Sequence, residues 1–430
     1  MLRRLILLAL LAAAALAQPP KFELRQPPGR PQVKTYTLPP DKLQKAIAYS
    51  DARNRAHFAG VAYGILVLIT VLAWKAGPKF RDWAEIASPR RRIGQAFIFG
   101  TLMVLTVDIL DLPVSLYLQN LGLRYEQSVQ SWLSWFRDWA MGELIGCILT
   151  GFLLWILYGV MRRSPRRWWF YFWLTSIPIV IFLEFVSPVV IDPLFNKYQP
   201  LEATQPVLVA QIERVVQRGG LSIPPDRMYQ MNASEKVTTL NAYVSGIGAS
   251  KRVVVWDTTM KRMTVGEILF VFGHEMGHYV LGHNYILTGA TLLVILIFLF
   301  IGYHTMRRAL ARWGAAWGIR GMDDWASLPV LMLMLAVLSF LAEPVMNAVS
   351  RELEHNADIY GLEVVHGIVP DSSQAAAEAF QILGEASLSN PNPSPFIEFW
   401  LYSHPSVGDR VRFAAEYDPW KNGQSPKYVK

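Results

Sequence analysis

The stretch "VFGHEMGHYVLGHN", residues 271–284, places three histidines and a glutamate within ten residues of an otherwise apolar segment. Just before it, Thr264 and Glu267 have the spacing of a capping box, in which each side chain bonds the backbone N–H of the other residue. A helix is therefore expected to begin after Thr264 and to run to about His283. Burying so many titratable groups in an apolar helix costs free energy unless a metal ion or another partner binds them.

His274, Glu275 and His278 form the pattern HExxH. Residues four apart share one helix face, so the two imidazoles can bind the same zinc ion. The adjacent Glu275 can then accept a proton from water as a general base. The chain has only eight histidines in 430 residues, so this pattern would seldom arise by chance. The stretch therefore predicts a zinc hydrolase site.

The third metal ligand must come from another segment. Metzincins require the pattern HExxHxxGxxH, but Leu281 and Asn284 stand where the glycine and the third histidine belong. His283 is rotated away from the ligand face and is expected to form a hydrogen bond at the helix end instead. In "SRELEHNADIYG", residues 350–361, Glu354 and Asp358 are four apart on an expected helix. Glu354 can bind zinc while Asp358 orients a ligating histidine.

The composition indicates a membrane protein. Hydrophobic residues make up 52% of the chain and charged residues only 17%, against about a quarter charged in soluble domains. Six apolar runs approach or exceed the roughly 20 residues that span a bilayer. They cover approximately residues 57–75, 93–118, 141–161, 168–190, 285–304 and 325–348. The expected fold class is mainly α, a polytopic helical membrane protein with a zincin-like catalytic domain that carries a small β-hairpin or sheet.

The N-terminal segment resembles a secretory signal peptide. Arg3 and Arg4 precede a short apolar run that ends in a small-residue cleavage site before Gln18. The alternative is an uncleaved first membrane helix, which would raise the number of spans from six to seven. Cys147 is the only cysteine, so an intrachain disulfide and a multi-cysteine metal site are both excluded.

The positive charge is concentrated in short loops between the apolar runs. Arginines cluster at residues 90–92, 162–167 and 307–320, which fall on one side of the membrane if the six spans alternate. Short loops rich in Lys and Arg mark the cytoplasmic side. The net charge of +8 therefore reports membrane topology, and nucleic acid is not expected as a partner. The predicted location is a bacterial inner membrane with the catalytic face outside the cytoplasm.

The expected organisation alternates membrane and polar segments. In the first polar region an amphipathic helix is expected near residues 205–219. The stretches "DRMYQM" and "KRVVVWDTT" are expected as strands, with a hairpin-like connection in "NAYVSGIGASKR" between them. The predicted segments are 1–17 (signal peptide or first helix), 18–56 (exported linker and amphipathic segment), 57–190 (four spans), 191–284 (first catalytic part), 285–348 (two spans) and 349–430 (second catalytic part).

Five blocks in the same order resemble the integral-membrane zinc endopeptidases typified by the type 1 CAAX prenyl protease. They are "PLFNKYQPL", "NAYVSG…KRVVVWDT", "HEMGHYVLGH", "SRELEHNAD" and "YSHPSVGDR", and the resemblance extends over roughly residues 42–415. The resemblance implies that Glu354 is the third zinc ligand. It also implies that His404 stabilises the oxyanion and that Arg410 orders the carboxylates. Asn241 would hold the substrate backbone, and the strand containing Val253, Val254 and Val255 would add the substrate as a further strand.

The chain departs from that family in two ways. The first membrane helix of the family is replaced by the signal-like segment, which puts the wall of the large intramembrane chamber of eukaryotic members in doubt. Those members also present their catalytic groups to the cytosol, whereas the arginine pattern here predicts the opposite orientation. Prenylated cytosolic peptides are therefore not expected as substrates.

The predicted function is that of a zinc-dependent membrane metalloendopeptidase with one Zn²⁺ per chain, acting on peptides or membrane-associated proteins. Two alternatives stay open from the sequence. A site-2-type intramembrane protease also uses HExxH, but its third ligand is an aspartate in an LDG-like motif that does not occur here. A non-catalytic zinc-containing transporter or chaperone is the second alternative, with Asp108 and Asp111 in an apolar run as its only support.

Overall fold

Long membrane helices dominate the fold. The computed structural model describes residues 32–246, 251–421 and 423–429. The predicted signal peptide, residues 1–17, lies outside the described residues. Six of the described helices are long and apolar enough to cross a membrane, as the sequence predicted. They are α2 (Pro40–Ala73), α4 (Arg92–Arg124), α5 (Trp132–Arg163), α6 (Trp168–Val186), α12 (His283–Trp317) and α13 (Leu328–Val365).

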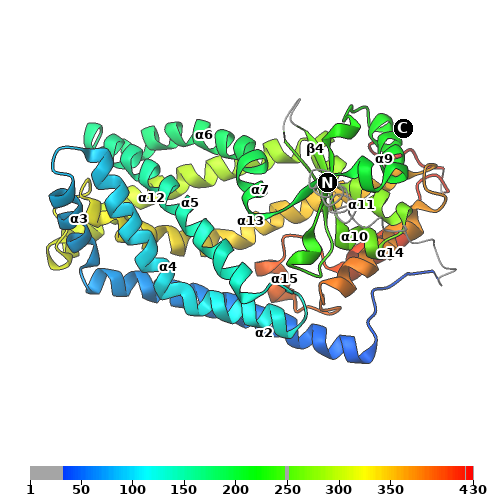
Figure 1. Cartoon of the computed structure of the whole chain (residues 1–430), viewed down its shortest axis with the longest axis horizontal. Helices are drawn as coiled ribbons and strands as arrows, with labels where there is room; N and C mark the ends of the chain where they lie inside the picture. Colours follow the sequence, from blue (N-terminus) through cyan, green and yellow to red (C-terminus); the bar gives the residue numbers. More distant parts are fainter. Residues whose placement is uncertain (1–31, 247–250, 422, 430) are drawn as a thin grey trace, which may run out of the picture.

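The arginine-rich loops gather at one end of the helix bundle, on the left of Figure 1. The short helix α3 (Ala76–Ala87) lies there against the segment that precedes α13. A buried ion pair between Arg81 Nη1 and Asp324, 2.7 Å long, joins the two. The metal-binding motif lies at the other end, on the right of the same view, where α11 is labelled. The bundle therefore separates a basic end from the end that carries the predicted catalytic residues, which is called the catalytic end below.

A small mixed sheet forms part of the catalytic end. Its strands are β1 (Tyr198–Pro200), β2 (Met228–Met231), β3 (Ala242–Ser245) and β4 (Arg252–Trp256), in the spatial order β1-β2-β4-β3. β2 and β4 are parallel, and the other two pairs are antiparallel. Both predicted strands are present, but the stretch between them contributes a strand of its own, β3, which forms the hairpin with β4.

The helix that carries the HExxH motif is α11 (Val265–Val280). The predicted capping box is confirmed, because Thr264 N–H donates to the Glu267 carboxylate at 2.7 Å and Glu267 N–H donates to the Thr264 hydroxyl at 3.4 Å. The predicted end near His283 is wrong. Gly282 adopts a left-handed conformation with φ of 70°, so α11 ends before it and a separate helix, α12, begins at His283. His283 therefore approaches the motif from a different helix.

α13 continues without a break from the last membrane span to Glu354 and Asp358, so the predicted boundary between residues 348 and 349 lies inside one helix. It packs tightly on α11. A Cβ on Gly361 would lie 2.9 Å from the backbone nitrogen of His274, and one on Gly273 would lie 2.8 Å from the Val364 side chain. The two glycines thus let the two ligand-bearing helices come into contact.

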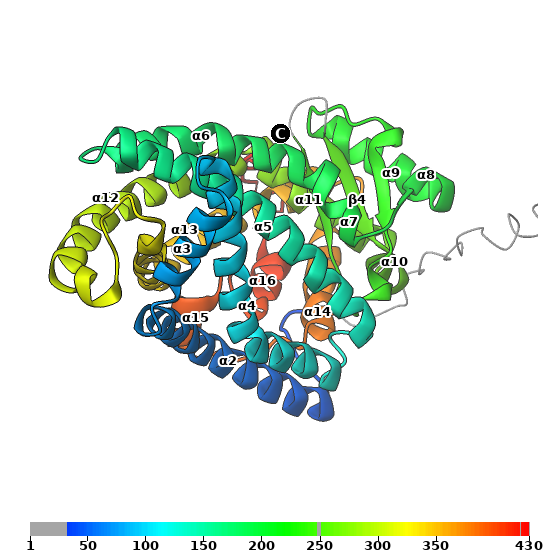
Figure 2. The same ribbon diagram turned by 60° about the vertical axis from the view of Figure 1, so that its left-hand side comes forward.

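The catalytic end contains further helices. They are the short helices α7 (Asp192–Phe195), α8 (Leu201–Thr204) and α10 (Asp257–Arg262), the amphipathic α9 (Pro206–Arg218), and α14 (Ser372–Ala386), α15 (Pro395–Leu401) and α16 (Val407–Glu416). Of these, α9, α14, α15 and α16 pack against α11 or α13. α9 matches the amphipathic helix predicted near residues 205–219. One hydrophobic core, which includes Phe270, Phe272 and Phe380, joins α9, α11, α13, α14 and α16. Figure 2 labels these five helices.

Candidate metal centre

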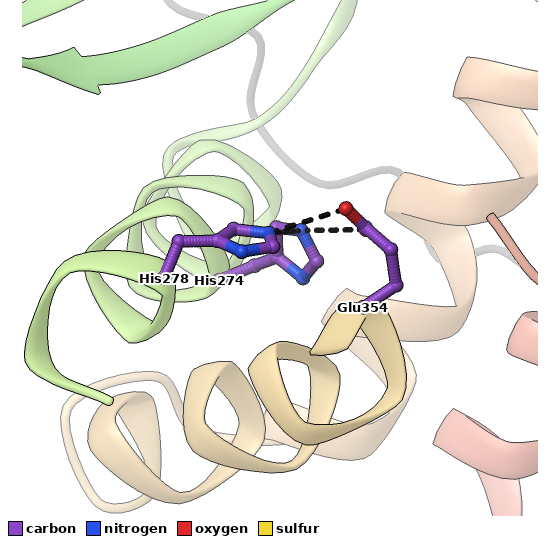
Figure 3. A group of neighbouring side chains, drawn as sticks. All are labelled: His274, His278 and Glu354. Atoms are coloured by element: carbon purple, nitrogen blue, oxygen red, sulfur yellow. Dashed lines mark hydrogen bonds and ion pairs between the residues drawn. The ribbon is translucent and has the colours of Figure 1, made fainter. Parts of the chain in front are cut away.

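The side chains of His274, His278 and Glu354 converge where α11 and α13 cross (Figure 3). His274 Nε2 lies 3.3 Å from one carboxylate oxygen of Glu354, and His278 Nε2 lies 3.3 Å from the other. The two Nε2 atoms are 3.2 Å apart, and the three potential ligand atoms lie within 4.8 Å of one another. The structure thus brings together the three residues that the sequence predicted as metal ligands.

This arrangement fits a divalent metal. Glu354 Oε2 is buried and accepts no hydrogen bond of regular geometry from any described residue, although the Nε2 atoms of His274 and His404 each lie 3.3 Å from it. Two neutral imidazoles and one carboxylate are a donor set of catalytic zinc sites, which keep a further coordination position open. His274, His278 and Glu354 would therefore hold the metal.

A hydrogen-bonded chain behind His274 fixes its orientation. His274 Nδ1 lies 2.7 Å from the Asp358 carboxylate, which leaves Nε2 free to face Glu354 and His278. Arg410 in turn donates two hydrogen bonds to Asp358, at 2.6 and 3.0 Å, and lies 3.8 Å from Glu354. Asp358 is 1% exposed, so this ion pair is shielded from solvent. Asp358 thus contacts His274, and Arg410 contacts Asp358, as expected for residues that orient the predicted ligands.

The carboxylates near His274 affect its protonation. Burial disfavours the charged form of His274, but the Asp358 and Glu354 carboxylates outweigh burial and raise the pKa of His274 to about 9. A metal ion must bind the neutral imidazole, so metal binding has to displace that proton. The carboxylates that orient the ligands therefore also couple metal affinity to pH.

His283 contacts the second ligand from α12. Its Nδ1 lies 3.0 Å from His278 Nδ1, and the residue is only 3% exposed. A hydrogen bond between these two atoms requires the proton to sit on one of them, and a proton on His278 Nδ1 leaves its Nε2 as the metal-facing atom. The sequence predicted that His283 forms a hydrogen bond. It did not predict the partner, because the contact depends on the break between α11 and α12 at Gly282.

His404 approaches Glu354 from the loop between α15 and α16. Its Nε2 lies 3.3 Å from Glu354 Oε2, and its Nδ1 lies 2.9 Å from the Ser403 hydroxyl. The His404 side chain is 54% exposed, unlike the buried ligands. Its ring therefore lies at the edge of the metal centre and faces the open side.

A cavity of about 610 Å³ opens in front of the ligands. Glu275, Asn241, His404 and Arg410 contribute to its wall together with His274. Burial raises the pKa of Glu275, although the two neighbouring histidines act in the opposite direction. A raised carboxyl pKa suits a group that takes up and releases a proton near neutral pH. The cavity thus brings the predicted general base Glu275, the predicted ligand His274, His404 and the exposed Asn241 to one space.

The predicted role of Val253, Val254 and Val255 in binding substrate is wrong. All three residues are fully buried, and β4 is hydrogen-bonded on both edges, to β2 and to β3. A strand with two occupied edges has no backbone groups left to pair with a peptide. Among the described strands, β1 and β3 lie at the two edges of the sheet. β3 packs against α11, and Asn241 directly precedes it in the sequence.

The cavity also contains polar groups that the sequence analysis missed. His57 on α2 and Glu343 on α13 line its far wall and form an ion pair 3.1 Å long. Both residues lie inside or at the end of an apolar run, where a titratable side chain is a signal for function. The pairing itself could not be predicted, because it joins residues 286 positions apart.

Two protein-family models match the chain. The model described as peptidase family M48 matches residues 202–418, and the model described as the CAAX prenyl protease N-terminal region with five membrane helices matches residues 23–197. The metalloprotease YhfN of Bacillus subtilis (strain 168) is 35% identical over 377 residues, which cover 88% of this chain and 86% of the relative.

More distant relatives extend the likeness to eukaryotic proteins. A CAAX prenyl protease 1 homolog of Oryza sativa subsp. japonica is 26% identical over 390 residues, with 89% of each chain covered. The crystal structure of S. mikatae Ste24p has a TM-score of 0.75 with 21% identity, covering 88% of this chain and 89% of that chain. The last comparison is a likeness of fold.

Proposed function

The chain belongs to peptidase family M48 and is a membrane-embedded metalloprotease, and from this premise we propose that it is a zinc-dependent endopeptidase with one metal ion per chain. The observation that carries the proposal is the convergence of His274, His278 and Glu354 on one point, next to a cavity whose wall contains His274 and Glu275. When bound, zinc polarises the scissile carbonyl and makes water at the site more acidic.

The roles of the surrounding side chains follow from their positions. Glu275 takes the proton of the attacking water and delivers it to the leaving amine. His404 donates a hydrogen bond to the carbonyl oxygen of the scissile bond as negative charge develops there. Asp358 holds His274 through Nδ1, and Arg410 holds Asp358 while offsetting the negative charge of the buried carboxylates.

Substrate binding is proposed at the free edge of β3 rather than at β4. A peptide in extended form would pair with the outward backbone groups of β3 and run past Asn241 towards the metal. Backbone pairing gives affinity with little dependence on side chains, so specificity would come from the cavity wall. The substrates proposed are peptides or membrane-associated proteins.

The orientation proposed places the catalytic end outside the cytoplasm, in a bacterial inner membrane. The support is the arginine-rich loops at the other end of the bundle, since such loops stay in the cytoplasm. This orientation would separate the catalytic groups from prenylated cytosolic peptides. The two alternatives from the sequence, a site-2-type protease and a non-catalytic transporter or chaperone, are not favoured by the family match.

Metal removal and replacement tests the proposal. The purified protein would be treated with a chelator, its zinc measured by mass spectrometry, and cleavage of an internally quenched peptide followed as metal is returned. We expect activity to disappear with the metal and to return in proportion to zinc, up to one ion per chain. Full activity in the metal-free protein, or recovery with Mg²⁺ alone, would reject zinc as the cofactor.

A further inference from the structure

A second cavity lies at the basic end of the molecule, away from the metal centre. Its volume is about 480 Å³, and it is bounded by the start of α4, the last two turns of α5 and one residue of α6. Its polar lining consists of Arg92, Arg162, Arg163 and Thr175, and its apolar lining of Trp155, Ile156, Gly159 and Val160. No acidic side chain contributes to the lining, so the cavity combines positive charge at one end with apolar walls.

Two of the three guanidinium groups are held in place by buried neutral partners. Arg162 stacks over the Trp325 ring at 4.8 Å and donates to the main-chain carbonyl of Asp323 at 3.4 Å. Arg92 Nη1 donates to Gln95 Oε1 at 3.0 Å, and Trp325 Nε1 donates to the same oxygen at 3.3 Å. Gln95 is 3% exposed and Trp325 is 1% exposed, so this support is part of the core.

These arginines lack a direct ionic partner. Within residues 32–246, 251–421 and 423–429, none of Arg92, Arg162 and Arg163 forms an ion pair with a carboxylate, although the Asp323 carboxylate is near enough to act electrostatically on Arg162. By contrast, Arg81 and Arg320 at the same end of the bundle are paired with acidic side chains. Holding like charges together costs free energy unless an anion binds between them.

We propose that this cavity binds one anionic phospholipid, with its phosphate between Arg92, Arg162 and Arg163. Trp155 and Ile156 lie seven to eight residues before Arg163 on α5, which places them about 12 Å further into the membrane span. This distance is similar to the separation between the phosphate of a lipid and the upper part of one of its acyl chains. Gly159 leaves the space between the charged and apolar ends open, since a Cβ there would meet only the Arg163 guanidinium, at 3.6 Å.

A lipid fits the cavity better than a free phosphate or an acidic protein segment does. Trp155 is 43% exposed on a helix that is apolar enough to cross a membrane, so its environment is hydrocarbon rather than water. Basic pockets between membrane helices on the cytoplasmic side are places where anionic head groups bind. The three arginine-rich loops gather at this end, which is the end that we assign to the cytoplasm.

The experiment measures lipid binding by native mass spectrometry on the delipidated full-length protein, titrated with phosphatidylglycerol or phosphatidylcholine. The test variant is Arg92→Gln with Arg163→Gln. The matched control is Arg90→Gln with Arg166→Gln, which removes the same charge from the same two loops outside the cavity lining. Arg162 is left unchanged because it packs on Trp325.

We expect wild type and the control to retain one phosphatidylglycerol and the test variant to bind it roughly thirtyfold more weakly. Gly159→Leu, which fills the cavity without changing charge, should also lose the tightly bound lipid. All variants should keep wild-type peptide cleavage, because the metal centre is at the other end. Equal weakening in the control, equal affinity for phosphatidylcholine, or displacement of the lipid by millimolar inorganic phosphate would each overturn the proposal.

Discussion

At the residue scale, the two histidines of the HExxH motif were the most informative residues for predicting the metal site, because one helical turn fixes the relative position of two side chains four residues apart. His274 and His278 could therefore be assigned together from the sequence. Glu354 could be paired with Asp358 by the same reasoning, but nothing local placed that pair opposite the histidines. The contact of α11 with α13 depends on glycines 88 positions apart, Gly273 and Gly361. That packing emerges only in three dimensions.

The third-ligand assignment predicts how zinc content responds to substitution. Glu354→Ala should lose most of the bound zinc, because among the described residues its carboxylate is the one that faces the Nε2 atoms of both His274 and His278. Glu352→Ala is the matched control from the same helix turn, since Glu352 instead accepts a hydrogen bond from Asn356, and it should keep about one zinc per chain. The amount of zinc per mole of folded protein, measured for both variants, tests this expectation. Full occupancy in Glu354→Ala would reject the assignment.

His404 is expected to affect rate rather than metal content. Its side chain is half exposed at the edge of the centre, 3.3 Å from Glu354, and our proposal assigns the imidazole ligands to His274 and His278. His404→Ala should therefore keep its zinc while kcat falls on the order of a hundredfold or more, as for a lost oxyanion donor. Metal analysis and steady-state kinetics on the same preparation test this. Loss of zinc in parallel with activity would identify His404 as a ligand.

At the scale of elements, the six spans and the cap of α11 were predictable because composition and local hydrogen bonding determine them. The sheet was not predictable to the same degree. Residues 252–256 show strong β-propensity, but such an apolar strand can lie either at the edge or in the centre of a sheet. In the structure Val253–Val255 are buried and β4 lies between two neighbouring strands, so it is a central strand. The strand order depends on β2, which is 21 or more residues away in the sequence.

The free edge of β3 makes a prediction of its own. Trp256 N–H donates to the Asn241 carbonyl, so by the alternation of an antiparallel pair the N–H of Val244 points away from β4. Val244→Pro removes this donor and should lower kcat/KM roughly five- to tenfold, the effect of one lost hydrogen bond. Val244→Ala, which shortens the same side chain but keeps the N–H, is the control. Equal kinetics in the two variants would argue against β3 as the docking edge.

At the scale of the whole molecule, the position of the basic loops opposite the metal centre predicts the orientation in the membrane. In a Cys147→Ala background, a cysteine at exposed Ser394, which caps α15 at the catalytic end, should react with a membrane-impermeant thiol reagent in intact cells. A cysteine at Ser164, in the arginine-rich loop after α5, should react only after the membrane is opened. The reverse labelling pattern would place the catalytic end in the cytoplasm.

The arrangement of the bundle explains what sequence could and could not predict at this scale. Alternating spans require the three basic loops to share one side, so their common location was predictable. The cavities were not, because the packing of several helices against one another decides which side chains surround each of them. The cavity next to His274 and Glu275 is lined by residues of α2, α11, α13 and α14. The cavity at the basic end is lined by residues of α4, α5 and α6.

The central claim is that Glu275 performs the proton transfers while His274, His278 and Glu354 hold the metal. Glu275→Gln, which keeps the size of the side chain and removes its basicity, tests this most directly. The purified variant should contain about one zinc per chain, as wild type does, while its kcat for an internally quenched peptide falls by roughly 10²–10⁴-fold. Near-wild-type turnover in a zinc-loaded Glu275→Gln protein would contradict the account.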